Sequence, residues 1–157
     1  MKKHNIVDIL IFIISAELVG ALSALLSGGF SDFYDKYNQP PLSPPAWLFP
    51  IVWTVLYAVM GFSAYLIYSS DAKPKTKEKA LTIYWAQLAV NFLWTIVFFR
   101  FEALWAAFAV ILLLWVLIIL MILCFRKINQ IAAYINIPYL LWVTFATYLN
   151  LAVAIIN

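Results

Sequence analysis

The sequence predicts an all-α membrane protein, a bundle of five transmembrane helices forming a single domain over residues 1–157. Hydrophobic residues make up 66% of the chain and charged residues only 11%, with a mean hydropathy of +0.96. Soluble domains carry about 25% charged residues, so this chain could not cover a water-exposed surface. The apolar residues gather in five stretches, each near the roughly 20 residues needed to cross about 30 Å of hydrocarbon.

The predicted spans follow one another closely and leave too little chain for a soluble domain. They cover residues 6–26, 46–68, 81–101, 103–124 and 131–156. Only the connections at residues 27–45 and 69–80 are longer than a few residues.

The basic residues predict the orientation of the bundle. Eight of them flank the spans on one side and two on the other. Basic residues are retained on the cytoplasmic side, so we expect a cytoplasmic N-terminus and an external C-terminus. The two sets are Lys2, Lys3, Lys73, Lys75, Lys77, Lys79, Arg126 and Lys127 against Lys36 and Arg100.

The first span carries small residues at four-residue spacing: Ala16, Gly20, Ala24 and Gly28. Such a stripe forms a groove into which another helix packs closely. The neighbour is either another helix of the same bundle or a second copy of the chain. Glu17 lies beside the stripe, and a carboxyl group in hydrocarbon is a functional candidate because its burial is costly. We expect it to be protonated or hydrogen-bonded to an amide or an indole.

Prolines mark the approach to the second span and the interior of two spans. The run Gln39–Pro45 predicts a stiff, extended segment, with Ser43 as the N-cap of the helix that follows. Pro50 and Pro138 fall inside the second and fifth spans, where each removes a backbone hydrogen bond. Both helices are therefore expected to bend there and to create space between neighbours.

The seven tryptophans divide into two groups. Three lie near span ends, where indoles form the aromatic belt of a membrane protein: Trp47, Trp85 and Trp105. Four lie deeper, where the indole N–H needs a partner: Trp53, Trp94, Trp115 and Trp142.

Several polar and aromatic residues are predicted to share one layer of the bilayer. At a rise of ~1.5 Å per residue they lie between ~10 and ~21 Å from the outer ends of their spans. They are Glu17, Trp53, Tyr57, Asn91, Trp94, Trp142 and Ala146.

Helical spacing places several of these residues on common faces. Gln87, Asn91, Trp94 and Phe98 form one stripe of a helix. Amides flanked by indoles suit a flat, largely apolar ligand, but the same amides could instead hydrogen-bond neighbouring helices together. The spacing leaves both interpretations open.

Other kinds of site find little support in the residues. There is no Ser/His/Asp set, and one His and one Cys cannot make a metal site. No metal and no required cofactor are predicted. The positive charge, with a pI of about 9.0, lies in short clusters between spans and predicts topology rather than nucleic-acid binding.

Three segments resemble the TspO/MBR family, which includes the tryptophan-rich sensory proteins and the translocator protein or peripheral benzodiazepine receptor. They are Pro40–Trp47 continued by Pro50–Tyr57 to Gly61, Asn91–Trp94 with Phe98–Phe99, and Pro138–Trp142 through Phe145–Asn150.

The resemblance implies a bacterial-type five-helix bundle in the inner (plasma) membrane, forming a homodimer. It implies binding of tetrapyrroles such as protoporphyrin IX, and of benzodiazepine-type ligands, in a pocket beneath the first connection. The matching pocket residues are Tyr34, Trp47, Trp53, Tyr57, Asn91, Trp94, Trp142, Ala146 and Leu149. Where many members carry an acid on the fourth span, this chain has Ala109.

Three hypotheses follow from the residues and the resemblance together. The first is an integral membrane protein that binds tetrapyrroles and other planar hydrophobic ligands, with a transport or sensing role. The second is photo-oxidative degradation of protoporphyrin IX, with Trp53 and Trp142 as the catalytic electron donors. The third is a regulatory scaffold whose Lys73–Lys79 surface contacts a partner.

Overall fold

The computed structural model describes residues 5–157, and in this range five helical segments are long and apolar enough to cross a membrane. They are α1 (Ile6–Ser27), α3 (Leu48–Tyr68), α4 (Pro74–Thr95) continued by the π-helical η1 (Ile96–Arg100), α5 (Leu104–Arg126), and α6 (Gln130–Tyr134) followed by α7 (Ile137–Ile156). The predicted fold class is confirmed. Lys2 and Lys3, which entered the charge count, lie outside the described residues.

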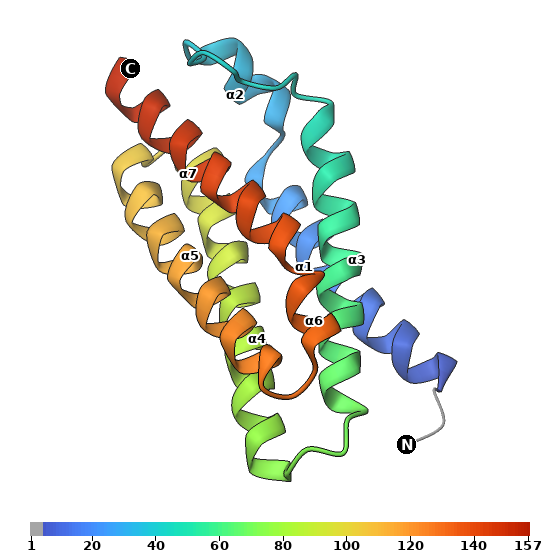
Figure 1. Cartoon of the computed structure of the whole chain (residues 1–157). Coiled ribbons are helices and arrows are strands. Elements are labelled where there is room, and N and C mark those ends of the chain that lie inside the picture. The colour runs from blue at the N-terminus through green and yellow to red at the C-terminus, as the bar shows by residue number, and fades with distance from the viewer. Residues whose placement is uncertain (1–4) are drawn as a thin grey trace.

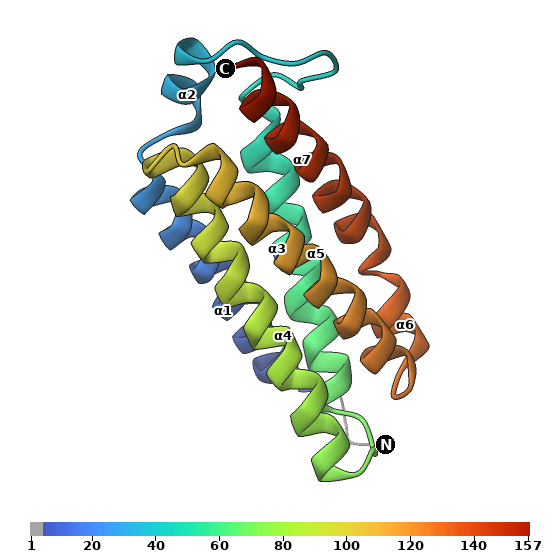
Figure 2. The same cartoon turned by 90° about the vertical axis from the view of Figure 1, so that its left-hand side faces the viewer.

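The long helices run side by side, and α1 begins at the end of the bundle opposite to that at which α7 ends (Figures 1 and 2). Helix α1 packs on α3, α4 packs on α5, and α5 also packs on α7. The centre is filled by large, fully buried side chains, including Tyr65, Tyr84 and Tyr139. Leucines and isoleucines are exposed on the outer faces, as expected for helices surrounded by lipid.

Helices α1 and α3 approach so closely that small residues are required where they meet. A Cβ atom on Gly61 would lie 2.6 Å from both the Ile13 Cα and the Phe12 carbonyl oxygen. A Cβ atom on Gly20 would collide with the ring of Tyr57. At Gly20 the stripe of small residues on α1 therefore serves packing within the bundle.

The first connection contains a helix that the sequence did not predict. Gly28 and Gly29, with φ of 92° and 126°, end α1 and turn the chain, since positive φ is tolerated best by glycine. The short helix α2 (Phe30–Lys36) follows and lies over one end of the bundle (Figure 1). Its apolar side chain Phe33 is buried beneath it.

Two predicted span boundaries are corrected by the structure. Helix α4 begins at Pro74, seven residues before the predicted Leu81, because its lysine-rich first turns are helical without being apolar. Proline suits this first helical position because the N–H that it lacks would have had no partner. The predicted fifth span is broken into α6 and α7 near Asn136, whose side chain donates to the Ala132 carbonyl.

The predicted effects of the prolines are also revised. Pro138 lies in the first turn of α7, so the chain breaks just before it rather than bending at it. Pro50 lies in the first turn of α3, where a missing N–H breaks no hydrogen bond, and the expected bend is wrong. Ser43 does not cap α3, which begins five residues later at Leu48 with Trp47 at its N-cap.

Replacing Gly61 by alanine tests the close approach of α1 and α3. Helix propensity alone favours alanine over glycine by about 1 kcal/mol. The clash with Ile13 and Phe12 should outweigh this gain and destabilise the bundle by about 1–3 kcal/mol. The measurement is thermal unfolding in detergent, with Ala89→Val on the exposed face of α4 as the control. A midpoint equal to or above that of the wild type would show that the helices can separate freely.

Candidate functional site

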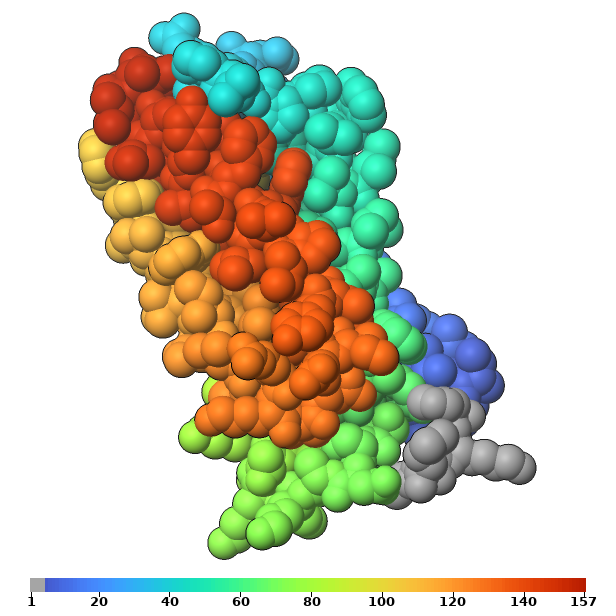
Figure 3. Space-filling model, viewed as in Figure 1, coloured from blue at the N-terminus to red at the C-terminus, as the bar shows by residue number. Residues whose placement is uncertain are grey.

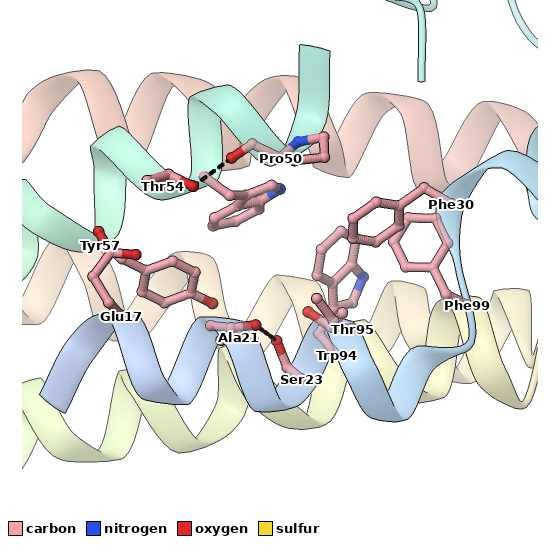
Figure 4. Close-up of a pocket in the computed structure, with 13 residues that line it drawn as sticks. Glu17, Ala21, Ser23, Phe30, Pro50, Thr54, Tyr57, Trp94, Thr95 and Phe99 are labelled. Atoms are coloured by element: carbon pink, nitrogen blue, oxygen red, sulfur yellow. Dashed lines mark hydrogen bonds between the residues drawn. The ribbon is translucent and has the colours of Figure 1, made fainter. Parts of the chain in front are cut away.

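A cavity within the described part of the bundle lies between α1, α3 and α4, under the start of α2 (Figure 4). Its volume is about 140 Å³. Three residues at its rim, Ala21, Pro50 and Thr54, are exposed, so it opens sideways between α1 and α3. The lining comprises Glu17, Gly20, Ala21, Ser23, Ala24, Phe30, Pro50, Trp53, Thr54, Tyr57, Trp94, Thr95 and Phe99.

This cavity has a polar end and an aromatic end. Glu17 and Tyr57 lie together at one end, and Phe30 and Phe99 lie at the other (Figure 4). The hydroxyl groups of Thr54 and Ser23 donate to backbone carbonyls one turn earlier, at 2.7 and 2.8 Å. Glu17 is the one carboxyl group among the lining residues. The site therefore offers apolar ring faces and a single acidic group.

A second, smaller cavity of about 30 Å³ lies between α2, η1 and α7. Its lining includes Tyr34, Ala146 and Leu149, three residues that the family resemblance assigns to the pocket. Trp94 and Phe99 line both cavities. The two rings are thus the partition between the cavities, and their displacement would join the two spaces.

The partition is held by ring contacts and by a chain of hydrogen bonds. The indole N–H of Trp94 donates to Asn150 Oδ1 at 3.0 Å, and Asn150 Nδ2 donates to the Leu104 carbonyl at 2.9 Å. The Trp94 ring stacks on Phe98, with centroids 5.5 Å apart, and lies 6.3 Å from Trp53. Asn150 ends one of the three segments that resemble the family, but its spacing in the sequence did not indicate a hydrogen bond to Trp94.

The buried amides of α4 hold helices together and do not line either cavity. Asn91 Nδ2 donates to the Tyr139 hydroxyl at 2.9 Å, and that hydroxyl donates to Gln87 Oε1 at 2.7 Å. Gln87 Nε2 in turn approaches the Met60 sulfur at 3.5 Å. The sequence left open whether these amides bind a ligand or join neighbouring helices. In the structure, Asn91 and Gln87 form hydrogen bonds between helices.

Two more of the expected pocket residues lie outside the cavities. Trp142 lines an apolar groove of about 420 Å³ between α3 and α7, on the face shown in Figure 3. Its indole N–H is buried and has no partner among the described residues, while its ring lies 5.7 Å from that of Phe49, which lines the smaller cavity. Trp47 is 66% exposed and lines neither cavity.

Aromatic residues that the spacing did not single out complete the lining. Phe30 and Phe33 come from α2, and Phe49 comes from the start of α3. The phenyl rings of Phe30 and Phe99 meet edge to face, with centroids 4.6 Å apart. Phe30 and Phe33 were missed because they lie in a connection, where helical periodicity gives no signal.

Polar contacts fasten α2 and the first connection over the smaller cavity. Glu102, between η1 and α5, forms an ion pair with Lys36 and accepts from the Tyr37 hydroxyl at 2.8 Å. One residue further along the connection, the Asn157 side chain bonds the Asn38 backbone N–H and carbonyl, each at 3.0 Å. These contacts make α2 and residues 37–41 a tied cover over the bundle.

Burial and pairing set the charge states of this cover. Burial raises the pKa of Tyr34 to about 12, so its hydroxyl is neutral at physiological pH. Hydrogen bonds from Lys36 and Tyr37 lower the pKa of Glu102, which therefore stays ionised. The hydrogen bond to Glu102 also raises the pKa of the Lys36 ammonium.

Five spanning helices around aromatic-lined cavities, beneath a tied cover, define a multi-pass α-helical membrane protein. The model of the TspO/MBR family matches residues 11–156, and the chain belongs to this family. It is 38% identical to the tryptophan-rich sensory protein of Cereibacter sphaeroides over 76% of this chain and 73% of that one.

Relatives also occur in other domains of life. The tryptophan-rich protein TspO of Archaeoglobus fulgidus is 31% identical over 90% of this chain and 97% of its own. The translocator protein of Ovis aries is 33% identical over 75% of this chain and 70% of its own.

The contact between Glu102 and α2 predicts a pH-dependent cover. The pKa of Glu102 is lowered in the folded state, so its stabilising contribution is present above the ordinary value of 4.5 and is lost as the pH falls through the lowered value. Hydrogen exchange of residues 30–38, corrected for intrinsic rates, should therefore be slow at pH 5–8 and several-fold faster at about pH 3.

Glu102→Gln should show the faster exchange already at neutral pH, because the amide cannot pair with the Lys36 ammonium. Asp35→Asn, on the exposed side of the same helix, removes one charge without touching Glu102 and should exchange like the wild type. If Glu102→Gln leaves exchange of α2 unchanged, Glu102 does not tie the cover down.

Proposed function

We propose that this protein binds tetrapyrroles, protoporphyrin IX first, and other planar hydrophobic molecules within the helix bundle. Its family membership makes it a membrane protein of the sensory and translocator type. The observation that carries the finer proposal is the pair of aromatic-lined cavities with Trp94 and Phe99 between them. Flat ring systems stack favourably on such side chains.

The volumes of the cavities decide how a ligand would fit. Pockets for drug-sized molecules hold about 300–1,000 Å³. The two cavities hold only about 140 and 30 Å³, so a tetrapyrrole requires the partition to move. In the proposal Trp94 and Phe99 swing aside, and the ligand spans from Trp53 and Tyr57 to Tyr34, Ala146 and Leu149.

The sideways opening suggests a path for such a ligand. Ala21, Pro50 and Thr54 border the larger cavity on the surface between α1 and α3. A hydrophobic molecule dissolved in the bilayer could reach the cavity there without crossing the tied cover. In this proposal Asn91 and Trp142 support the site from outside the cavities, and the exposed Trp47 takes no part in binding. We also propose, as the family resemblance implies, that the protein lies in the inner membrane and forms a homodimer.

Titration with protoporphyrin IX tests the proposal. Purified protein in detergent should shift the porphyrin absorbance and quench tryptophan emission saturably. Trp53→Ala should weaken binding, and Ala146→Phe, which fills the smaller cavity, should weaken it about tenfold or more because overpacking costs about 1–3 kcal/mol.

Two controls accompany these variants. Ala109→Phe adds the same bulk at an exposed site on α5, and Trp47→Phe changes an indole that lines neither cavity. Both should bind like the wild type. Equal affinities for all four variants would place the porphyrin outside the bundle.

A second candidate is light-dependent oxidation of the bound porphyrin. It is favoured by the ring contacts of Trp53, whose centroid lies 5.7 Å from Tyr57 and 6.3 Å from both Trp94 and Tyr139. Such a cluster suits an indole that donates an electron to a photoexcited ligand. The ligand passes this electron to molecular oxygen, the indole radical cation takes an electron back from the ligand ring, and the superoxide adds to the oxidised ring, so that one porphyrin and one O2 are consumed. Trp142, the other predicted donor, contacts Phe49, which lines the smaller cavity.

Illumination of the complex in air separates the two candidates. Oxidation by the protein predicts that the pigment bleaches faster than in detergent alone, and that Trp53→Phe slows this bleaching while the porphyrin still binds. Bleaching at the detergent rate would leave binding as the function. The Trp47→Phe variant again serves as the matched control.

A further inference from the structure

A basic hollow lies at the end of the bundle opposite the tied cover. It has a volume of about 310 Å³ and lies where α4 begins and α5 ends. The first turns of α4 extend beyond the end of α5 and form one wall (Figure 2). The lining consists of Lys75, Thr76, Lys79 and Ala80 from α4 with Cys124 and Lys127.

The charge of this hollow is not compensated by the described part of the chain. Lys75, Lys79 and Lys127 have no hydrogen-bond or ion-pair partner within residues 5–157, and no acidic residue is among the lining. Lys77, on the same helix, differs because its ammonium donates to the Tyr68 and Ser70 carbonyls. Three free ammonium groups around one space form a site for an anion.

The surroundings of the hollow are apolar on one side. A neighbouring groove of about 410 Å³ is lined by Leu123, Arg126 and Lys127, and Lys127 is common to both. Exposed side chains continue from there along α5 at helical spacing. They are Leu113, Val116, Leu120 and Leu123.

We propose that the hollow binds the phosphate of an anionic phospholipid, with an acyl chain lying along the exposed stripe of α5. Clusters of lysine and arginine at the ends of membrane spans attract anionic headgroups. Lysine stems reach along apolar surface while their ammonium groups stay at the headgroup level. A free phosphate ion has the same charged group as the lipid headgroup, but it has no acyl chain to contact the exposed apolar stripe of α5.

The proposal also agrees with the predicted topology. The Lys73–Lys79 connection is the most basic part of the side that the charge count assigns to the cytoplasm, where anionic lipids gather. The site lies at the other end of the bundle from the cover and shares no residue with the two internal cavities. Its test is therefore independent of porphyrin binding.

Native mass spectrometry in an uncharged detergent tests the site with phosphatidylglycerol and, separately, phosphatidylcholine of the same chain length. The wild type should retain phosphatidylglycerol at least about tenfold more tightly than phosphatidylcholine. Lys79→Gln/Lys127→Gln should lose about tenfold or more of the phosphatidylglycerol affinity and little of the phosphatidylcholine affinity. Lys36→Gln/Arg100→Gln removes the same charge at the other end of the bundle and should bind both lipids like the wild type.

Three results would overturn the proposal. One is equal retention of both lipids by the wild type, and another is equal loss of phosphatidylglycerol in the two double variants. The third is displacement of phosphatidylglycerol by inorganic phosphate at matched ionic strength, which would assign the hollow to a soluble phosphate. Unchanged thermal unfolding midpoints verify that both double variants remain folded.

Discussion

The need to satisfy polar groups inside a hydrocarbon layer governs the interior of this protein. The Tyr139 hydroxyl lies between Asn91 and Gln87, and it joins α7 to α4 through three fully buried side chains. The Trp94 indole meets the same need through Asn150, which also bonds the start of α5. Because an unmet donor in lipid is costly, these bonds fix how three helices face one another.

The proposed binding site depends on this arrangement. Trp94 cannot leave the partition between the cavities without giving up its bond to Asn150. A ligand that joins the cavities must therefore offset that bond through stacking and burial of its own surface. The cover adds a second layer of control, because Glu102 and Asn157 hold the chain that follows α1 across the smaller cavity. The larger cavity still opens to the side, between α1 and α3, where neither the partition nor the cover blocks it.

The sequence predicted correctly which residues share one face of a helix. It did not predict which residues of two different elements contact each other. The small residues of α1 predicted a close contact, and Tyr57 on α3 packs against one of them, Gly20. The stripe of Asn91 and Gln87 predicted inward-facing amides, but their partner Tyr139 lies 48 and 52 residues further along the chain. Phe30 and Phe33 gave no signal, because a short helix in a connection shows neither length nor periodicity.

Composition and the lengths of the apolar stretches were enough to predict five membrane-spanning helices. The reason is that the thickness of the hydrocarbon layer sets the length of a spanning helix, and that the residues along this length must be mostly apolar. The order of the three motifs indicated the family, because each motif is a short stretch that can be recognised in the sequence alone. Only the tertiary structure decided that the shared aromatic layer is mostly filled, divided by Trp94 and Phe99 into two small spaces. Side-chain packing between distant helices sets the size of a cavity, and no spacing within one helix contains that information.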